Sequence, residues 1–510
     1  MAELSSRMQK TASAILPKIA ATIAERTSAT RKIDLATAEN WLLRPEIVEI
    51  CKTAIQENLT EAKLSYPDGF GGDPKLQEAF AAFFNKYFDP VSRVETRDIV
   101  VTPGASSCLD SLLFSLCEVG DSVLVLAPYW SGFDFHFVLR PNINIIPVYT
   151  DAVCLLDQPE DLLSESLVPA LQRAIENCDD EDCVKALVIT NPHNPIARCY
   201  PRHILQEAIH WCAERGLHYI SDEVYAISDF SATESLPETN GVTSLGENGG
   251  GTPEATAVNG SKEHHAVPFV SALALELEAD KTPPISVIWS TSKDLGSSGF
   301  RMGVHVSRRR PVSSETNGDS SEAYATVAGP SLLTTSLGLL STTQLPTISM
   351  LVTSALLTSD SFDALVAQNR QRLREHHKIM SRRLQKWGVP FIPATSGPYV
   401  LAYLGVKVGD LQRRSRDETA AASSSQGQQE DDPTNMKRRR MSVSGHEGED
   451  VIDVLRREAS VLVSPGKSFH MRGKSDTPEP MDGWARINFA MPAEVLEDAL
   501  NRIGKTLGLE

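Results

Sequence analysis

Apolar residues along the chain form short β-branched runs that alternate with longer segments of helical spacing. Most runs lack regular polar alternation, as expected for strands that helices cover on both faces. The predicted strands are 98–104, 122–128, 143–149, 184–190, 217–223, 285–291 and 303–307. Helices are predicted at 106–119, 203–216 and 362–388. The pattern predicts an α/β fold with a mostly parallel, doubly wound sheet.

The domain organisation follows from the length of 510 residues, which exceeds what one compact core usually holds. The long helix at 362–388 is of a kind that links two domains, and the segments after it indicate a smaller α+β unit. We therefore predict an N-terminal helix or arm at 1–45, a large domain at 46–345 and a small C-terminal domain at 346–510.

Two stretches break the globular pattern, at 231–266 and 410–449. Both are rich in small and polar residues and nearly empty of large apolar ones, so burial cannot offset the entropy of ordering them. They are predicted to be disordered surface insertions, and 311–322 a polar connection. The second contains a basic run at 437–440 followed by Ser442, which suggests a kinase-accessible regulatory loop that is dispensable for the chemistry.

Charge and cysteine usage narrow the class of protein. With 49 Lys and Arg against 66 Asp and Glu the net charge is −17, which disfavours nucleic acid and anionic membranes as partners. The eight cysteines show no metal-binding or disulfide spacing, so we expect reduced thiols and no metal site. No apolar run is long enough to span a membrane. A cytoplasmic protein is predicted; a mitochondrial presequence within 6–32 is the less favoured alternative to an amphipathic helix.

The segment 290–303 carries the first chemical signal. A single lysine after a strand is usually a solvated surface residue, but Lys293 lies three residues after Ser290 and eight before Arg301. A lysine that forms a Schiff base with a phosphorylated cofactor needs a nearby hydroxyl and cation to hold the phosphate. These three residues provide that combination.

Other polar residues follow the ends of other predicted strands. The turn at 103–106 begins a helix, so its amides and the Ser106 hydroxyl could bind a phosphate, although many α/β turns look similar. Asn194 lies in an Asn-Pro-x-Asn-Pro turn, and Asp222 and Tyr225 follow a strand; alone, these would suggest a turn and a helix cap. Together they could bind the phenolic oxygen and the protonated nitrogen of a pyridine ring.

The order of these motifs resembles that of the class I/II aminotransferases, which are pyridoxal-phosphate (PLP) enzymes of fold type I. Within them, the chain is most similar to the 1-aminocyclopropane-1-carboxylate (ACC) synthase branch. The resemblance covers nearly the whole chain outside the insertions. The matching segments are 34–42, 127–135, 190–197, 221–225, 290–303, 464–470 and 483–490.

The resemblance implies how PLP is held. Lys293 would form the Schiff base and then move the Cα proton, while Asp222 keeps the ring nitrogen protonated. Asn194 and Tyr225 would bind the ring phenolate, and Trp130, or less favourably Tyr129, would stack on the ring. The phosphate would be held by Ala105, Ser106, Ser290 and Arg301.

The resemblance also implies the substrate side and the assembly. Arg486 would bind the carboxylate of an α-amino acid, a task that suits its planar guanidinium, and Glu39 would lie beside the substrate. Tyr66 would reach the phosphate site of a second subunit, which implies a homodimer with composite sites. This chain departs from the ACC synthase branch in the position of the tyrosine in this segment, which has the sequence SYPDGFGGDPKL at 65–76. It departs again at Leu109, which replaces a residue that is polar in many relatives.

These departures weaken S-adenosylmethionine as a substrate more than they weaken PLP as the cofactor. We therefore favour transamination over ACC synthesis or over β- or γ-elimination, including C–S bond cleavage. A PLP-binding protein that has lost activity or acts as a regulator is a further alternative.

Overall fold

The computed structural model describes residues 32–150, 163, 167–231, 266–278, 281–308, 331–405, 450–471 and 483–510, with short pieces before residue 32. The predicted insertions at 231–266 and 410–449 fall almost entirely outside the described residues. So do the polar connection at 311–322, Ser442, and most of 6–32.

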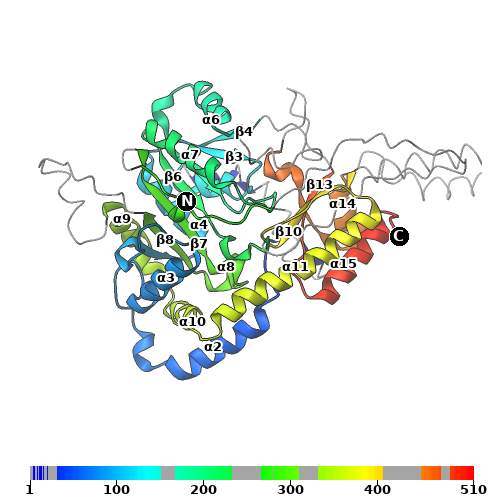
Figure 1. Ribbon diagram of the computed structural model, residues 1–510, viewed down its shortest axis with the longest axis horizontal. Helices are drawn as coiled ribbons and strands as arrows, with labels where there is room; N and C mark the ends of the chain where they lie inside the picture. Colours follow the sequence, from blue (N-terminus) through cyan, green and yellow to red (C-terminus); the bar gives the residue numbers. More distant parts are fainter. Residues whose placement is uncertain are drawn as a thin grey trace, which may run out of the picture.

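A seven-stranded sheet forms the centre of the larger part of the molecule (Figure 1). Its order is β2-β8-β7-β6-β5-β3-β4. β8 runs antiparallel to β2 and β7, and the remaining pairs are parallel. The prediction of a mostly parallel sheet is thus confirmed. The strands are β2 Ile99–Thr102, β3 Ser122–Ala127, β4 Asn144–Tyr149, β5 Val184–Thr190, β6 His218–Asp222, β7 Ile285–Ser290 and β8 Gly303–Arg308.

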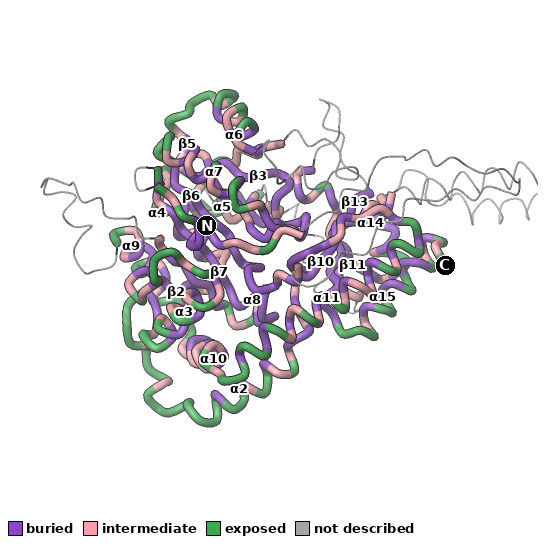
Figure 2. Tube along the Cα trace, in the orientation of Figure 1, coloured by how far each residue is buried: buried purple, intermediate pink, exposed green. Residues whose placement is uncertain are grey.

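Helices cover both faces of this sheet because successive strand residues point to opposite sides. In β3, Val123 and Val125 belong to one core cluster with α4 and α5, whereas Leu124 and Leu126 belong to another with α3, α6 and α7. Figure 2 shows the strands buried and the outer turns of α2 and α6 exposed. The helices of this part are α2 Arg44–Asn58, α3 Pro74–Tyr87, α4 Ala105–Leu116, α5 Phe133–Leu139, α6 Leu167–Glu176, α7 Arg202–Glu214, α8 Thr291–Asp294, α9 Leu332–Ser341 and α10 Thr347–Leu357.

A second, antiparallel sheet forms a separate part with its own core cluster. Its order is β12-β13-β10-β9, and helix α11 (Phe362–Trp387) runs from the large sheet to it (Figure 1). β1 (Ile33–Asp34) pairs with β11 (Val461–Leu462), which brings the N-terminal segment onto this part. The other elements are β9 Phe391–Ile392, β10 Tyr399–Tyr403, α14 Val451–Val454, β12 Ser464–Pro465, β13 Trp484–Asn488 and α15 Ala493–Thr506.

Two general expectations can be compared with the described residues. The seven cysteines among them are all free, whereas Cys154 lies outside them. No single described helix is long and apolar enough to cross a membrane; one pair, α10 with α11, passes the same test of length and composition but is bent by 86°.

Candidate active site

The predicted chemical residues gather where the parallel strands of the large sheet end. Asn194 follows β5, Asp222 is the last residue of β6, and Lys293 lies in α8 directly after β7. Because β5, β6 and β7 are parallel neighbours, their carboxyl ends meet at one edge of the sheet. This edge is where doubly wound sheets place their ligands.

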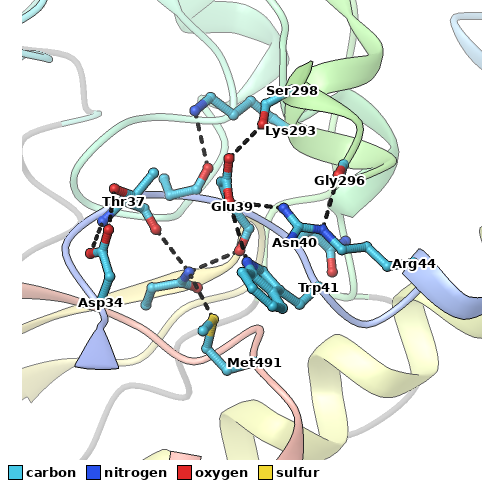
Figure 3. A network of polar contacts seen from close by, with 12 residues as sticks. Asp34, Thr37, Glu39, Asn40, Trp41, Arg44, Lys293, Gly296, Ser298 and Met491 are labelled. Atoms are coloured by element: carbon cyan, nitrogen blue, oxygen red, sulfur yellow. Dashed lines mark hydrogen bonds and ion pairs between the residues drawn. The ribbon is translucent and has the colours of Figure 1, made fainter. Parts of the chain in front are cut away.

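Lys293 is partly buried in this site. Its Nζ donates a hydrogen bond to the carbonyl oxygen of Ala38 at 3.0 Å (Figure 3). Burial, and then the positive charge of Arg486, lower the pKa of Lys293 to about 8, although Glu39 and Asp222 act in the opposite direction. A lysine with this pKa exchanges a proton readily near neutral pH.

Asp222 is the buried carboxylate of the site. Burial raises the pKa of Asp222 to about 7, against the lowering effects of the Val224 amide and the Lys293 charge. Its Oδ1 is buried and has no hydrogen-bond partner among the described residues. Leaving such an atom unpaired is costly, so a ligand that donates an N–H there would be bound strongly. A protonated pyridine nitrogen fits this requirement.

The start of α4 forms an anion-binding corner with Arg301. Gly104 precedes the helix with φ 96° and has no side chain to cap the first amides, those of Ala105 and Ser106. The Arg301 guanidinium lies against this turn and donates to the carbonyl oxygens of Ser298 at 2.9 Å and Pro103 at 3.3 Å. A Cβ atom on Gly104 would lie 2.3 Å from a guanidinium nitrogen. Helix amides and a cation therefore converge as a phosphate group requires.

The structure gives contacts for two further predicted residues, Ser290 and Trp130. The Ser290 hydroxyl caps α8 by accepting from the Ser292 amide at 3.1 Å, and it donates to the Met302 carbonyl at 2.9 Å. It thereby fixes the turn that carries Lys293, and its phosphate contact stays a prediction. The Trp130 ring lies 5.6 Å from that of His136, whose pKa is lowered by burial and by the charge of Arg301. The stacking of Trp130 on a cofactor ring stays a prediction.

Arg486 of β13 approaches the same site from the smaller part. It donates to Asn194 Oδ1 at 2.8 Å and to the Ala36 carbonyl at 2.7 Å. Its guanidinium carbon lies 4.8 Å from the ring centroid of Tyr399 and 4.9 Å from that of Phe469. These contacts hold the guanidinium in one orientation beside the cofactor residues, as a carboxylate-binding arginine requires.

Tyr225 lies next to this arginine. Its ring packs edge-on against Tyr399, with centroids 5.5 Å apart. Burial raises the pKa of Tyr225 to about 12 even though the charge of Arg486 lowers it. The phenol therefore remains a hydrogen-bond donor at neutral pH, as binding of a ring phenolate needs.

Glu39 is part of the N-terminal segment that lies beside Lys293 (Figure 3). One oxygen accepts from Ser298, and the other accepts from Arg44 at 2.8 Å and from Trp41 at 3.3 Å. Burial alone would raise the pKa of Glu39, but these hydrogen bonds leave it below its ordinary value. Glu39 is therefore an anion at neutral pH, within electrostatic range of Lys293.

A buried cluster of polar residues next to Lys293, formed by Asn40, Asn369 and Asp294, was not predicted from the sequence. The backbone carbonyl of Asp294 accepts from the side chains of Asn40 at 3.2 Å and Asn369 at 3.3 Å, and these two amides are 2.6 Å apart. The Asp294 carboxylate accepts from Ser228, from Trp289 and from the amide of Ile227. The only sequence signals were the adjacency of Asp294 to Lys293 and of Asn40 to Glu39.

Tyr66 is the one predicted site residue that a single chain does not bring to the site. Its side chain is 93 % exposed, just after the short helix Glu61–Leu64. Its predicted contact belongs to a second subunit and stays a prediction.

Comparison with known proteins agrees with this geometry. The family model of the aminotransferases of class I and II matches residues 30–503. A probable aminotransferase of Aspergillus oryzae, aclI, is 35% identical over 99% of this chain and 98% of its own length. A probable aminotransferase of Aspergillus fumigatus, gliI, is 30% identical over 94% of this chain and 90% of its own length.

More distant proteins are also similar to this chain. ACC synthase 1 of Oryza sativa subsp. indica is 27% identical over 85% of this chain and 70% of its own length. The solved structure of Thermus thermophilus aspartate aminotransferase with maleate superposes with a TM-score of 0.63 at 19% identity, covering 99% of this chain and 100% of that one.

Proposed function

Since the chain belongs to the class I and II aminotransferases, we propose that it transfers the amino group of an α-amino acid, with Lys293 moving the Cα proton. The predicted family and the fold type I architecture are both confirmed. The proposal rests on one observation, that Lys293, Asp222 and Arg486 meet in one site. The charges of Asp222 and Arg486 both act there on the pKa of Lys293.

The described residues fit PLP. Asp222 Oδ1 would accept the ring N–H, because it is buried without another described partner. The amides at the start of α4 and the Arg301 guanidinium would hold the phosphate. Asn194 and Tyr225 would bind the ring phenolate. When bound, PLP supplies an electron-accepting ring for the electron pair left at Cα.

Residues of the protein bind the substrate and transfer the proton. Arg486 binds the substrate carboxylate and is oriented for this by Asn194 and the Ala36 carbonyl. Lys293, with a pKa of about 8, takes the Cα proton and returns it, and its neutral form is accessible near pH 7. The Ala38 carbonyl of the N-terminal segment accepts a hydrogen bond from Lys293 Nζ and so positions this side chain.

Elimination with loss of a β- or γ-substituent is the second candidate. It is favoured by the similarity to ACC synthases over 85% of the chain and by the anionic Glu39 near Lys293. A human relative, 27% identical over 72% of this chain, is named a probable inactive ACC synthase-like protein. Similarity alone therefore does not establish activity, and the proposal rests also on the intact residues of the site.

The test is an assay of products. The purified protein is given PLP and a panel of amino acids, S-adenosylmethionine and cysteine conjugates. A keto acid supports transamination, whereas ACC, or ammonia with a thiol, would replace it by one of the eliminations. The absence of all of these products would overturn the proposal of an active enzyme.

We also infer a homodimer in which Tyr66 completes the site of the partner. Its exposed side chain supports this arrangement. Lys293→Ala and Tyr66→Phe subunits are mixed and the activity of the heterodimer is measured. Activity equal to the average of the two parents, or an active monomer in light scattering, would contradict composite sites.

A further inference from the structure

Two segments that match the family, 127–135 and 464–470, meet at a cluster of three side chains: Tyr129, Asp134 and His470. Asp134 belongs to α5 of the large part, and His470 to the loop that follows β12 of the smaller part. Asp134 and His470 have no part in holding PLP in the arrangement above, and Tyr129 is only the less favoured residue for stacking on its ring. The cluster joins the two parts of the molecule beside the active site.

The contacts within the cluster are specific. His470 Nε2 and Asp134 Oδ2 are 2.7 Å apart, and the Tyr129 hydroxyl donates to the other oxygen of Asp134 at 3.1 Å. The His470 ring stacks on the Tyr129 ring with centroids 4.4 Å apart and an interplanar angle of 16°. His470 also has a left-handed backbone with φ 56°, a conformation that non-glycine residues seldom adopt. Side-chain contacts on two sides stabilise it there.

The same loop leads directly to the carboxylate-binding arginine. At its start, the Ser464 hydroxyl accepts from Arg486 at 3.3 Å. Near its end, the Phe469 ring lies 4.9 Å from the Arg486 guanidinium, and the Phe469 carbonyl accepts from the Tyr129 amide at 2.9 Å. His470 follows Phe469, and Trp130 follows Tyr129 in sequence. The cluster therefore lies between Arg486 and the turn that carries Trp130.

We propose that His470 and Asp134 are positioning residues, which hold the loop 464–470 against the large part and so fix Arg486 relative to the cofactor site. The proposal rests on the proposed function, because it assigns Arg486 to a carboxylate. Asp134 acts on Arg486 through His470 and Phe469 and touches no reacting atom. Loss of the hydrogen bond between His470 and Asp134 would let the loop and the Phe469 ring move, and carboxylate recognition would weaken without loss of the cofactor.

The test uses two probes of the bound aldehyde that differ in one group. Aminooxyacetate carries a carboxylate, and O-methylhydroxylamine does not, so the ratio of their rate constants measures carboxylate recognition without knowledge of the natural substrate. We expect His470→Ala and Asp134→Ala each to lower this ratio about tenfold, because each removes a charge-assisted hydrogen bond. The rate with O-methylhydroxylamine and the affinity for PLP should stay within about twofold of the wild type.

Two further measurements separate positioning from folding. Because both residues act through one contact, the double variant should be no worse than either single variant. His470→Gln retains a donor and should restore part of the ratio. In the protein without PLP, hydrogen exchange in 127–135 should rise in both alanine variants, a readout that does not depend on activity.

The control is Lys467→Gln, which breaks an exposed ion pair between the same loop and Asp450. It should leave the probe ratio unchanged. An unchanged ratio in the alanine variants, or additive effects in the double variant, would overturn the positioning role. Failure of the wild type to show a cofactor band, or to react with either probe, would instead count against the proposed function.

Discussion

The two ends of the active site are built in different ways. At the cofactor end, Asp222, Lys293 and the start of α4 each lie at the end of a strand of one sheet or in the turn after it. At the substrate end, Arg486 is held by Ala36, Asn194 and Ser464, residues that are 450, 292 and 22 positions away along the chain. Under the proposed function, the chemistry of the cofactor depends on local turns, whereas carboxylate recognition depends on the packing of distant segments.

The causes of the pKa shifts also differ between the two ends of the site. At the cofactor end burial is the largest influence, and it brings the pKa of Asp222 to about 7 and that of Lys293 to about 8. Around Glu39 the hydrogen bonds from Ser298 and Arg44 outweigh burial and keep the carboxylate charged. A mutation at the cofactor end should therefore affect catalysis itself, and one at the substrate end should affect binding.

The largest effect is expected for Lys293→Ala. The variant lacks both the covalent attachment and the proton-transfer group, so turnover should fall by at least about 10⁴-fold. The visible absorbance of the bound cofactor should be lost or displaced. Lys185→Ala, which removes an exposed lysine at the start of β5, is the matched control and should change neither. A borohydride-reduced adduct that maps to any lysine other than Lys293 would contradict the assignment.

Asp222→Asn comes next, with an expected loss of about 10³-fold in turnover, because a neutral amide does not stabilise a protonated ring nitrogen. The control is Asp134→Asn, which changes a carboxylate outside the cofactor end and should leave kcat within about threefold. Equal losses in kcat for the two variants would break the distinction between the ends of the site.

The same variant also tests the raised pKa of Asp222. The proton is bound more tightly in the folded protein than in the unfolded chain, so its stabilisation is complete below the ordinary value of 3.8 and is lost as pH rises through about 7. An asparagine cannot lose a proton. In the absence of PLP, the Tm of the wild type should therefore fall relative to that of Asp222→Asn between about pH 5 and pH 8. Parallel Tm profiles would contradict the raised pKa.

The contrast between the ends also explains what the sequence could predict. Each strand of the large sheet was predicted within a residue or two, since continuous apolar runs are strong signals, and Asp222, Asn194 and Lys293 follow such runs directly. The contact between Glu39 and Ser298 and the group formed by Asn40, Asn369 and Asp294 were not predicted. Their partners are far apart in sequence, and a single polar residue in a buried segment carries no periodicity that reveals its partner.

Arg486→Lys should affect mainly substrate binding. The ammonium group cannot reproduce the planar contacts that the guanidinium makes with Asn194 and the Ala36 carbonyl. KM for the best amino acid should rise about 100-fold with a smaller fall in kcat. The control is Arg383→Lys, at a partly buried arginine of α11 whose guanidinium contacts Glu510. A large fall in kcat at unchanged KM would place Arg486 in the chemical step instead.

Ser298→Ala is expected to have the smallest effect and tests the substrate end most narrowly. The hydroxyl of Ser298 donates to one oxygen of Glu39, while Arg44 and Trp41 bind the other, so the variant frees one oxygen without removing the charge. Such a hydrogen bond to a charged, partly exposed carboxylate contributes about 1.5 kcal/mol, which corresponds to a change of about tenfold in KM. Lys293 should keep its lowered pKa, because burial and Arg486 are its main causes. The pH dependence of kcat should consequently match that of the wild type, and the control Ser359→Ala, in the exposed turn before α11, should change neither quantity. If the pH profile moved while KM stayed constant, Glu39 would act on Lys293 and not on the substrate, and the division between the two ends of the site would have to be redrawn.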